Sequence, residues 1–97
     1  MNKKKWTILS NHGHVFTYIA EHPQTTTQRL AQVMGLSIRA VQTIIDDLEK
    51  EGYLTRERVG RCNRYEVNPD KPMRHRLERK HPVGDVLLAL GCKLENF

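Results

Sequence analysis

Four polar side chains lie close together in the segment GLSIRAVQTIIDDLEKEGYL, residues 35–54. Arg39 can donate two hydrogen bonds to the edge of a guanine, and Gln42 can form a similar pair with an adenine. Thr43 can bond a base or a phosphate, and Ser37 can bond a phosphate. For each of these side chains the alternative is plain exposure to solvent. The choice depends on whether the local structure presents them together.

The apolar residues of the same segment predict a local structure that presents the four polar side chains together. They follow the three-and-four spacing of a one-sided helix, and they are Val41, Ile44, Ile45 and Leu48. We expect Ser37 to cap this helix, which should run to about Glu51 and stop at Gly52. Arg39, Gln42 and Thr43 then project together near its start. The acidic residues Asp46, Asp47, Glu49 and Glu51 should lie farther along, where Asp46 or Asp47 is a candidate partner for an arginine of the basic hairpin that follows, the wing.

Two shorter helices are predicted before this one. The first covers about residues 11–21, with Ser10 or Asn11 as its cap and Pro23 preventing its continuation. Its apolar row is Val15, Phe16 and Ile19. In the second, Thr25 and Gln28 fit a capping box, and the helix should reach Met34.

Residues 26–51 have the apolar spacing of a helix-turn-helix. Ala31 is small enough for two helices to cross closely, and Gly35 can take the positive φ of the turn. The wedge between the helices is filled by Leu30, Met34, Leu36, Val41 and Ile44. A helical hairpin with no role in DNA binding is the alternative. The basic hairpin that follows favours DNA binding.

That hairpin is predicted over residues 53–68. Its two predicted strands are YLTRERV and RYEV, and its tip is formed by Gly60-Arg61-Cys62-Asn63. Arg61, near the tip, is the best candidate for a minor-groove or phosphate contact, and Arg58 and Arg64 complete the candidate DNA-binding set. Tyr65 and Val67 should pack beneath the hairpin.

The positive charge is concentrated in two places. The 97 residues carry a formal net charge of +5. The lysines of residues 1–5 and the segment 53–81 carry the excess, whereas residues 6–52 are acidic overall. This pattern fits a nucleic-acid partner, although Lys3, Lys4 and Lys5 also fit a solubilising tail.

The remaining C-terminal part is a basic connector, 69–81, followed by a helix, 82–91. Pro82 at the first helical position and Gly91 past the end frame this helix. Its apolar stripe consists of Val83, Val86, Leu87, Leu90 and Leu94, widened by Leu88. Trp6, Ile8 and Leu9 are candidates to complete the patch. The stripe predicts either a homodimer interface or packing against the chain's own core, because periodicity marks a buried face without naming its partner.

Other function classes find little support in the sequence. No apolar run reaches membrane-spanning length and the start lacks a secretory segment, so we expect a cytoplasmic protein of one domain, residues 1–97. Cys62 and Cys92 are expected to be free thiols, Cys62 being either a redox-sensitive group or an incidental one. Five histidines lack the tight Cys/His pairs of zinc sites, so we predict no metal and no cofactor. No catalytic motif indicates an enzyme.

The sequence resembles the winged helix-turn-helix regulators of the broad MarR/ArsR type over residues 6–68. The stretch SIRAVQTIIDDLEKEGYLTRERVGRCNRYEV is similar to a group of small bacterial regulators that also carry an RH.LE motif and a VGD.L helix, here at residues 74–78 and 83–87. The resemblance implies a mainly α-helical α+β fold. It consists of a three-helix winged helix-turn-helix core, a two-stranded β-wing and an additional C-terminal helix.

The resemblance also implies a sequence-specific regulator of transcription that binds double-stranded DNA, often as a homodimer. The third helix is then expected to read the major groove. A winged helix used for protein or RNA contact, without operator specificity, is the alternative. The effector, the operator and the sign of regulation are left open by the sequence.

Overall fold

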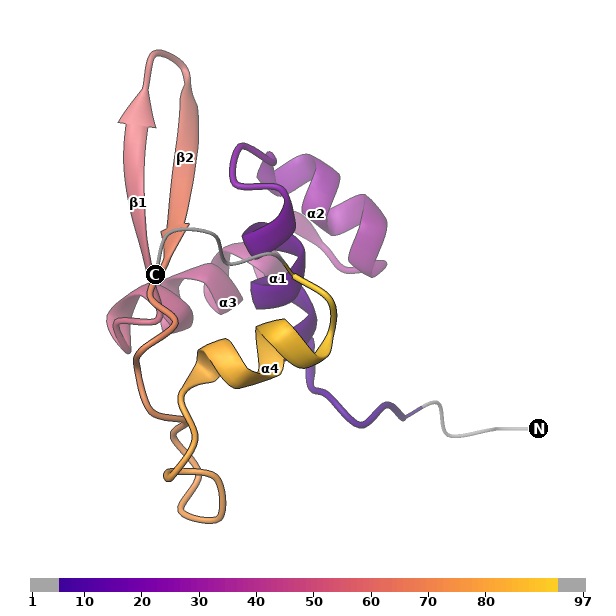
Figure 1. Ribbon diagram of the computed structural model, residues 1–97. Coiled ribbons are helices and arrows are strands. Elements are labelled where there is room, and N and C mark those ends of the chain that lie inside the picture. Colours follow the sequence, from indigo (N-terminus) through magenta and orange to yellow (C-terminus); the bar gives the residue numbers. More distant parts are fainter. Residues whose placement is uncertain (1–5, 93–97) are drawn as a thin grey trace, which may run out of the picture.

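Four helices and one β-hairpin make up the computed structural model, which describes residues 6–92 (Figure 1). The elements are α1 (Asn11–Glu21), α2 (Thr27–Met34), α3 (Ile38–Lys50), β1 (Leu54–Val59), β2 (Cys62–Val67) and α4 (Val83–Ala89). The predicted fold class, a mainly helical α+β winged helix-turn-helix, is confirmed. Lys3, Lys4, Lys5 and Leu94 lie outside the described residues.

One apolar core joins the helices to the base of the hairpin. The predicted rows of α1 and α3 are buried in it, because each helix turns one side to its neighbours. The buried members from these helices are Val15, Phe16, Ile19, Val41, Ile44, Ile45 and Leu48. Leu30 and Ala31 of α2 complete the contact, which fixes how α3 lies in the molecule.

The ends of the helices are set by short polar contacts, one of which differs from the prediction. The hydroxyl of Ser10 caps α1, and Gly35 ends α2 at a φ of 70°. The predicted capping box at Thr25 was wrong, because the cap of α2 is Thr26, which accepts the N–H of Arg29 at 3.0 Å. In a run of three threonines, the position of Gln28 pointed to a start one residue too early.

The hairpin is tighter at its tip than predicted. Val59 pairs directly with Cys62, so the turn contains only Gly60 and Arg61, and Cys62 and the residue after it belong to β2. Gly60 allows this at a φ of 63°. At the other end, the N–H of Tyr65 donates to the carbonyl of Pro23 at 2.8 Å, which ties β2 to the loop after α1.

The C-terminal helix packs against the chain's own core. Val83 and Leu87 are buried there, whereas Leu88 and Leu90 are exposed. The alternative of packing in cis therefore holds for the first half of the predicted stripe. The helix is shorter than the predicted 82–91, and Pro82 is its N-cap rather than its first helical residue.

Gly84 is the point of closest approach between α4 and the rest of the chain. A Cβ at this position would lie 2.8 Å from the Cβ of Pro69 and 3.0 Å from its carbonyl oxygen. The Gly84 N–H donates to that same oxygen at 2.9 Å, so the two segments cannot separate without losing the bond.

We therefore expect Gly84→Ala to destabilise the protein by about 1–3 kcal/mol, because the added methyl forces α4 away from Pro69. Urea unfolding measures the change, and Ala89→Gly, at an exposed position of α4, provides the comparison. A Gly84→Ala protein as stable as the wild type would show that α4 has no close packing at this point.

Candidate nucleic-acid interface

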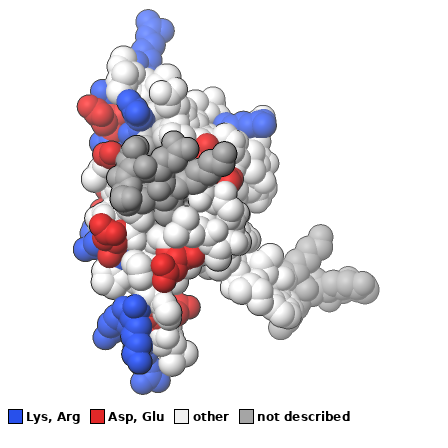
Figure 2. Space-filling view, viewed as in Figure 1, with Lys and Arg blue, Asp and Glu red and all other residues white. Residues whose placement is uncertain are grey.

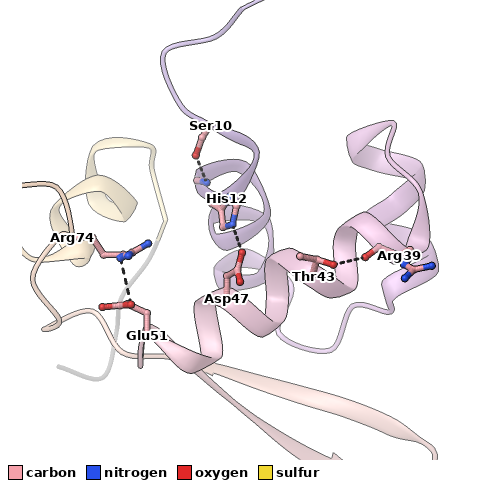
Figure 3. A network of polar contacts seen from close by, with 8 residues as sticks. Ser10, His12, Arg39, Thr43, Asp47, Glu51 and Arg74 are labelled. Atoms are coloured by element: carbon pink, nitrogen blue, oxygen red, sulfur yellow. Dashed lines mark hydrogen bonds and ion pairs between the residues drawn. The ribbon is translucent and has the colours of Figure 1, made fainter.

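The four polar residues predicted on the third helix are brought together by the structure at its start. Ser37 is the N-cap and accepts the N–H of Ala40 at 3.0 Å, which leaves its own hydroxyl hydrogen free to donate. Arg39, Gln42 and Thr43 are all exposed. Thr43 donates its hydroxyl hydrogen to the carbonyl of Arg39 at 3.1 Å, which leaves its oxygen available as an acceptor (Figure 3).

An α-helix has about 3.6 residues per turn, so side chains three or four residues apart point in similar directions. Opposite the buried row runs an exposed ridge, formed by Arg39, Thr43, Asp46 and Lys50. Gln42 and Glu49 lie on one flank of this ridge, and Asp47 and Glu51 lie on the other. The two flanks meet different parts of the molecule.

On the first flank, Arg56 of β1 joins the hairpin to α3. Its guanidinium lies 2.6 Å from Glu49 and 3.1 Å from Asp46. The hydrogen bond to Glu49 raises the pKa of Arg56, which therefore stays charged. The prediction that Asp46 or Asp47 pairs with an arginine of the wing is confirmed for Asp46, and Glu49 is an additional partner.

On the second flank, two side chains from other segments contact α3 (Figure 3). His12 of α1 lies 2.9 Å from Asp47, and Arg74 of the connector lies 3.3 Å from Glu51. Sequence reasoning missed both pairs. Partners so far apart along the chain leave no periodic signal, and only the packing of α1 and the connector around α3 brings them together.

The three arginines predicted on the wing do not share one face. The register places Leu54, Arg56 and Arg58 on the side of the hairpin that turns to the helices. Arg64 lies on the opposite side, directly across from Glu57. Arg61 is exposed in the turn between the strands.

Arg58 is held toward the end of the hairpin by a local contact. Its Nε–H donates to the carbonyl of Gly60 at 3.1 Å, next to Arg61. The pair Arg58 and Arg61 thus forms the basic end of the wing, and Figure 2 shows Lys and Arg atoms at this end of the molecule. Arg64 is set apart from them, beside an acid.

The rest of the described chain offers little other chemistry. Within residues 6–92, no group of three or more His, Cys, Asp and Glu side chains is placed to hold a metal ion. Cys62 is exposed, whereas Cys92 is buried, and burial raises the pKa of its thiol. None of the helices in this range is both long enough and apolar enough to cross a membrane.

A helix-turn-helix followed by a basic hairpin defines the class of winged helix-turn-helix proteins. A comparison with protein families matches residues 8–59, more than half of the chain, to the MarR family. The chain belongs to the MarR family. A comparison with curated proteins gives no match.

Among solved structures, MarR-type regulators share the fold. MepR, a transcription regulator of the Staphylococcus aureus multidrug efflux pump MepA, is 17% identical with a TM-score of 0.54, over 63% of this chain and 47% of its own. ZitR of Lactococcus lactis, a zinc-responsive MarR family member, is 17% identical with a TM-score of 0.53, over 68% of this chain and 47% of its own. The matched part of this chain thus spans about half of the length of these structures.

The contact of Arg56 with two carboxylates generates a prediction about the wing. Replacing Arg56 with Ala should loosen the hairpin from α3 and cost about 1 kcal/mol of folding free energy, because both partners are partly exposed to water. Hydrogen exchange of the amides in β1 and β2 should become faster. Arg64→Ala, on the far side of the same hairpin, is the control, and equal exchange in the two variants would contradict the anchoring role of Arg56.

Proposed function

We propose that this chain is a transcription regulator that binds double-stranded DNA in a sequence-specific manner. The start of α3 enters the major groove, and the basic end of the wing lies on the backbone or in the adjacent minor groove. The observation that carries the proposal is the exposed polar start of α3, where Arg39, Gln42 and Thr43 stand on a helix whose opposite side is buried.

Each residue of this surface has a chemical role in the proposal. Arg39 donates to a guanine and Gln42 pairs with an adenine, which gives base selection. Ser37 donates to a phosphate, and Thr43 accepts from a base, or donates to a phosphate if its hydroxyl turns away from the Arg39 carbonyl. Ile38 is 42% exposed beside them and can touch a thymine methyl group.

The acidic second half of α3 supports this orientation. Phosphates repel free carboxylates, so a helix with four acids near its end is expected to bind DNA through its start. Three of these carboxylates are moreover paired with Arg56 or Arg74, which lowers their repulsion of a duplex.

The rival function, a winged helix that contacts protein or RNA, calls for an apolar outer face on α3. In the described part of α3, Ile38 is the one large apolar side chain that is exposed, and polar groups surround it. We therefore favour DNA as the partner of α3. We also propose that the regulator has no catalytic role and acts in the cytoplasm.

A homodimer completes the proposal, because one winged helix reads only a few base pairs. MepR and ZitR are named as regulators, and their fold is shared by this chain. Exposed apolar side chains away from the polar start of α3 are available for pairing, and they are Trp6, Ile8, Leu88 and Leu90.

Selection of bound duplexes from random DNA gives the preferred site on which α3 can be tested. Arg39→Ala or Gln42→Ala should each cost about 1–3 kcal/mol on that site and relax the choice at one base pair. Lys50→Ala, at the other end of the same ridge, should leave the base preference unchanged. Equal weakening on all sequences would reassign Arg39 or Gln42 to a phosphate contact, and no loss in either variant would rule out this docking of α3.

The wing is tested by salt dependence. Arg61→Ala should weaken binding to specific and random duplexes alike, and it should flatten the plot of log affinity against log salt by about one unit. Fluorescence anisotropy over a range of salt concentrations measures both effects. Arg64→Ala should have the smaller effect, because Glu57 lies across from it, and an unchanged slope for Arg61→Ala would remove the turn from the interface.

A further inference from the structure

The basic connector between the wing and α4 forms an ordered loop whose two ends are joined by backbone hydrogen bonds. We define the connector loop as residues 70–82. At its base, the N–H of Met73 donates to the carbonyl of His81 at 3.0 Å, and the N–H of Val83 donates to the carbonyl of Lys71 at 2.8 Å. Pro72 and Pro82 face each other across this base as a bridge. The loop therefore leaves the body of the protein at a fixed place.

The outer part of the loop is also folded by its own contacts. The ring nitrogen Nδ1 of His75 accepts the N–H of Leu77 at 3.0 Å, and the carbonyl of His75 accepts the N–H of Glu78 at 2.8 Å. These bonds close a turn over residues 75–78, in which the ring of His75 is the only side chain that takes part. Arg76, Arg79 and Lys80 are held on this turn and are exposed.

The position of the loop relative to α3 indicates what it can bind. Arg74 binds Glu51, which lies on the flank of the ridge opposite to Glu49 and the wing. The exposed ridge of α3 thus has the basic wing on one side and the basic connector loop on the other. Figure 2 shows Lys and Arg atoms at both ends of the molecule, with Asp and Glu atoms between them.

The charges of the loop are available for an outside partner. Arg74 is engaged with Glu51, but no carboxylate within residues 6–92 forms an ion pair with Arg76, Arg79 or Lys80. Cations held at a fixed place without an internal partner suit a polyanion with regularly spaced charges. A DNA duplex carries one phosphate charge per roughly 1.7 Å of its axis, and it continues beyond the groove that α3 occupies.

We propose that the connector loop is a second DNA-backbone contact, which grips the duplex on the side of α3 opposite to the wing through Arg76, Arg79 and Lys80. This inference rests on the proposed function, since it needs a duplex placed along the ridge of α3. The contact is to phosphates, so it adds affinity and length of footprint without adding base preference.

The experiment compares the wild type with the double variant Arg76→Gln and Arg79→Gln on two duplexes. One duplex contains only the selected site, and the other adds about ten base pairs, roughly 34 Å, on each side. On the long duplex, the variant should bind about tenfold more weakly at moderate salt, and its salt slope should fall by about one unit for each phosphate that is no longer neutralised. On the short duplex, the two proteins should bind alike.

Two controls separate a contact from a general charge effect. Ala89→Glu lowers the net charge by one unit on exposed α4, and it should lower affinity equally on both duplexes. Glu78→Gln removes an acid from the loop itself and should strengthen binding to the long duplex alone. Thermal unfolding of the double variant should match the wild type, because both arginines are exposed.

Equal binding of the double variant and the wild type to the long duplex would overturn the connector contact, and a loss that is the same on both duplexes would do so too. In either case, the proposed function survives if Arg39→Ala still changes base preference. If the wild type binds no duplex in the selection, the proposed function fails, and the connector contact fails with it.

Discussion

The carboxylates at the C-terminal end of α3 join this helix to three neighbouring segments. Glu49 and Asp46 hold the wing through Arg56, Asp47 meets α1 at His12, and Glu51 meets the connector loop at Arg74. Each of these pairs is partly exposed, and pairs of this kind contribute little singly. Together they connect three separate segments to one helix, so the orientation of the wing and of the loop is defined relative to the polar start of α3.

This arrangement concerns the opposite charges at the two ends of α3. In the proposed function, the start of α3 attracts a polyanion, while its end carries a row of acids that repel one. Arg56 pairs with Asp46 and Glu49, and Arg74 pairs with Glu51, so arginines from neighbouring segments offset part of this negative charge, and those segments bring further basic residues with them. The negative end of the helix thereby becomes the point of attachment for positive surfaces on either side of the ridge.

Sequence periodicity was sufficient to predict the helices of the core. Rows such as Val41, Ile44, Ile45 and Leu48 repeat at the helical spacing, and burial follows directly from that spacing. Gly35 and Ser37 were also identified correctly, because each performs a local task that few residues can perform. The start of α2 and the width of the hairpin turn were missed by one or two residues, since several neighbouring positions satisfied the same local rules.

For the candidate site, the sequence could not predict the contacts between distant parts of the chain. The common direction of Arg39 and Thr43 follows from the helix itself, so it could be predicted. The separation of Arg64 from Arg58 follows from the alternation of side chains along paired strands, whereas the position of Arg64 directly across from Glu57 depends on the strand register, which the turn of Gly60 and Arg61 sets and which the wider predicted turn shifted. The pairing of Arg74 with Glu51 depends on how the connector packs, and no local pattern contains that information. For the same reason, the apolar stripe of α4 could not reveal that Leu87 is buried within its own chain.

The bond between the N–H of Tyr65 and the carbonyl of Pro23 has a consequence for the behaviour of the protein in solution. A two-stranded sheet has two open edges, and free edges invite strand pairing between molecules and then aggregation. Pro23 covers one donor of the β2 edge, and its own lack of an N–H means that the covering segment offers no donor at this residue for further pairing. The residue that prevents α1 from continuing therefore also blocks one position of the β2 edge against strand pairing between molecules.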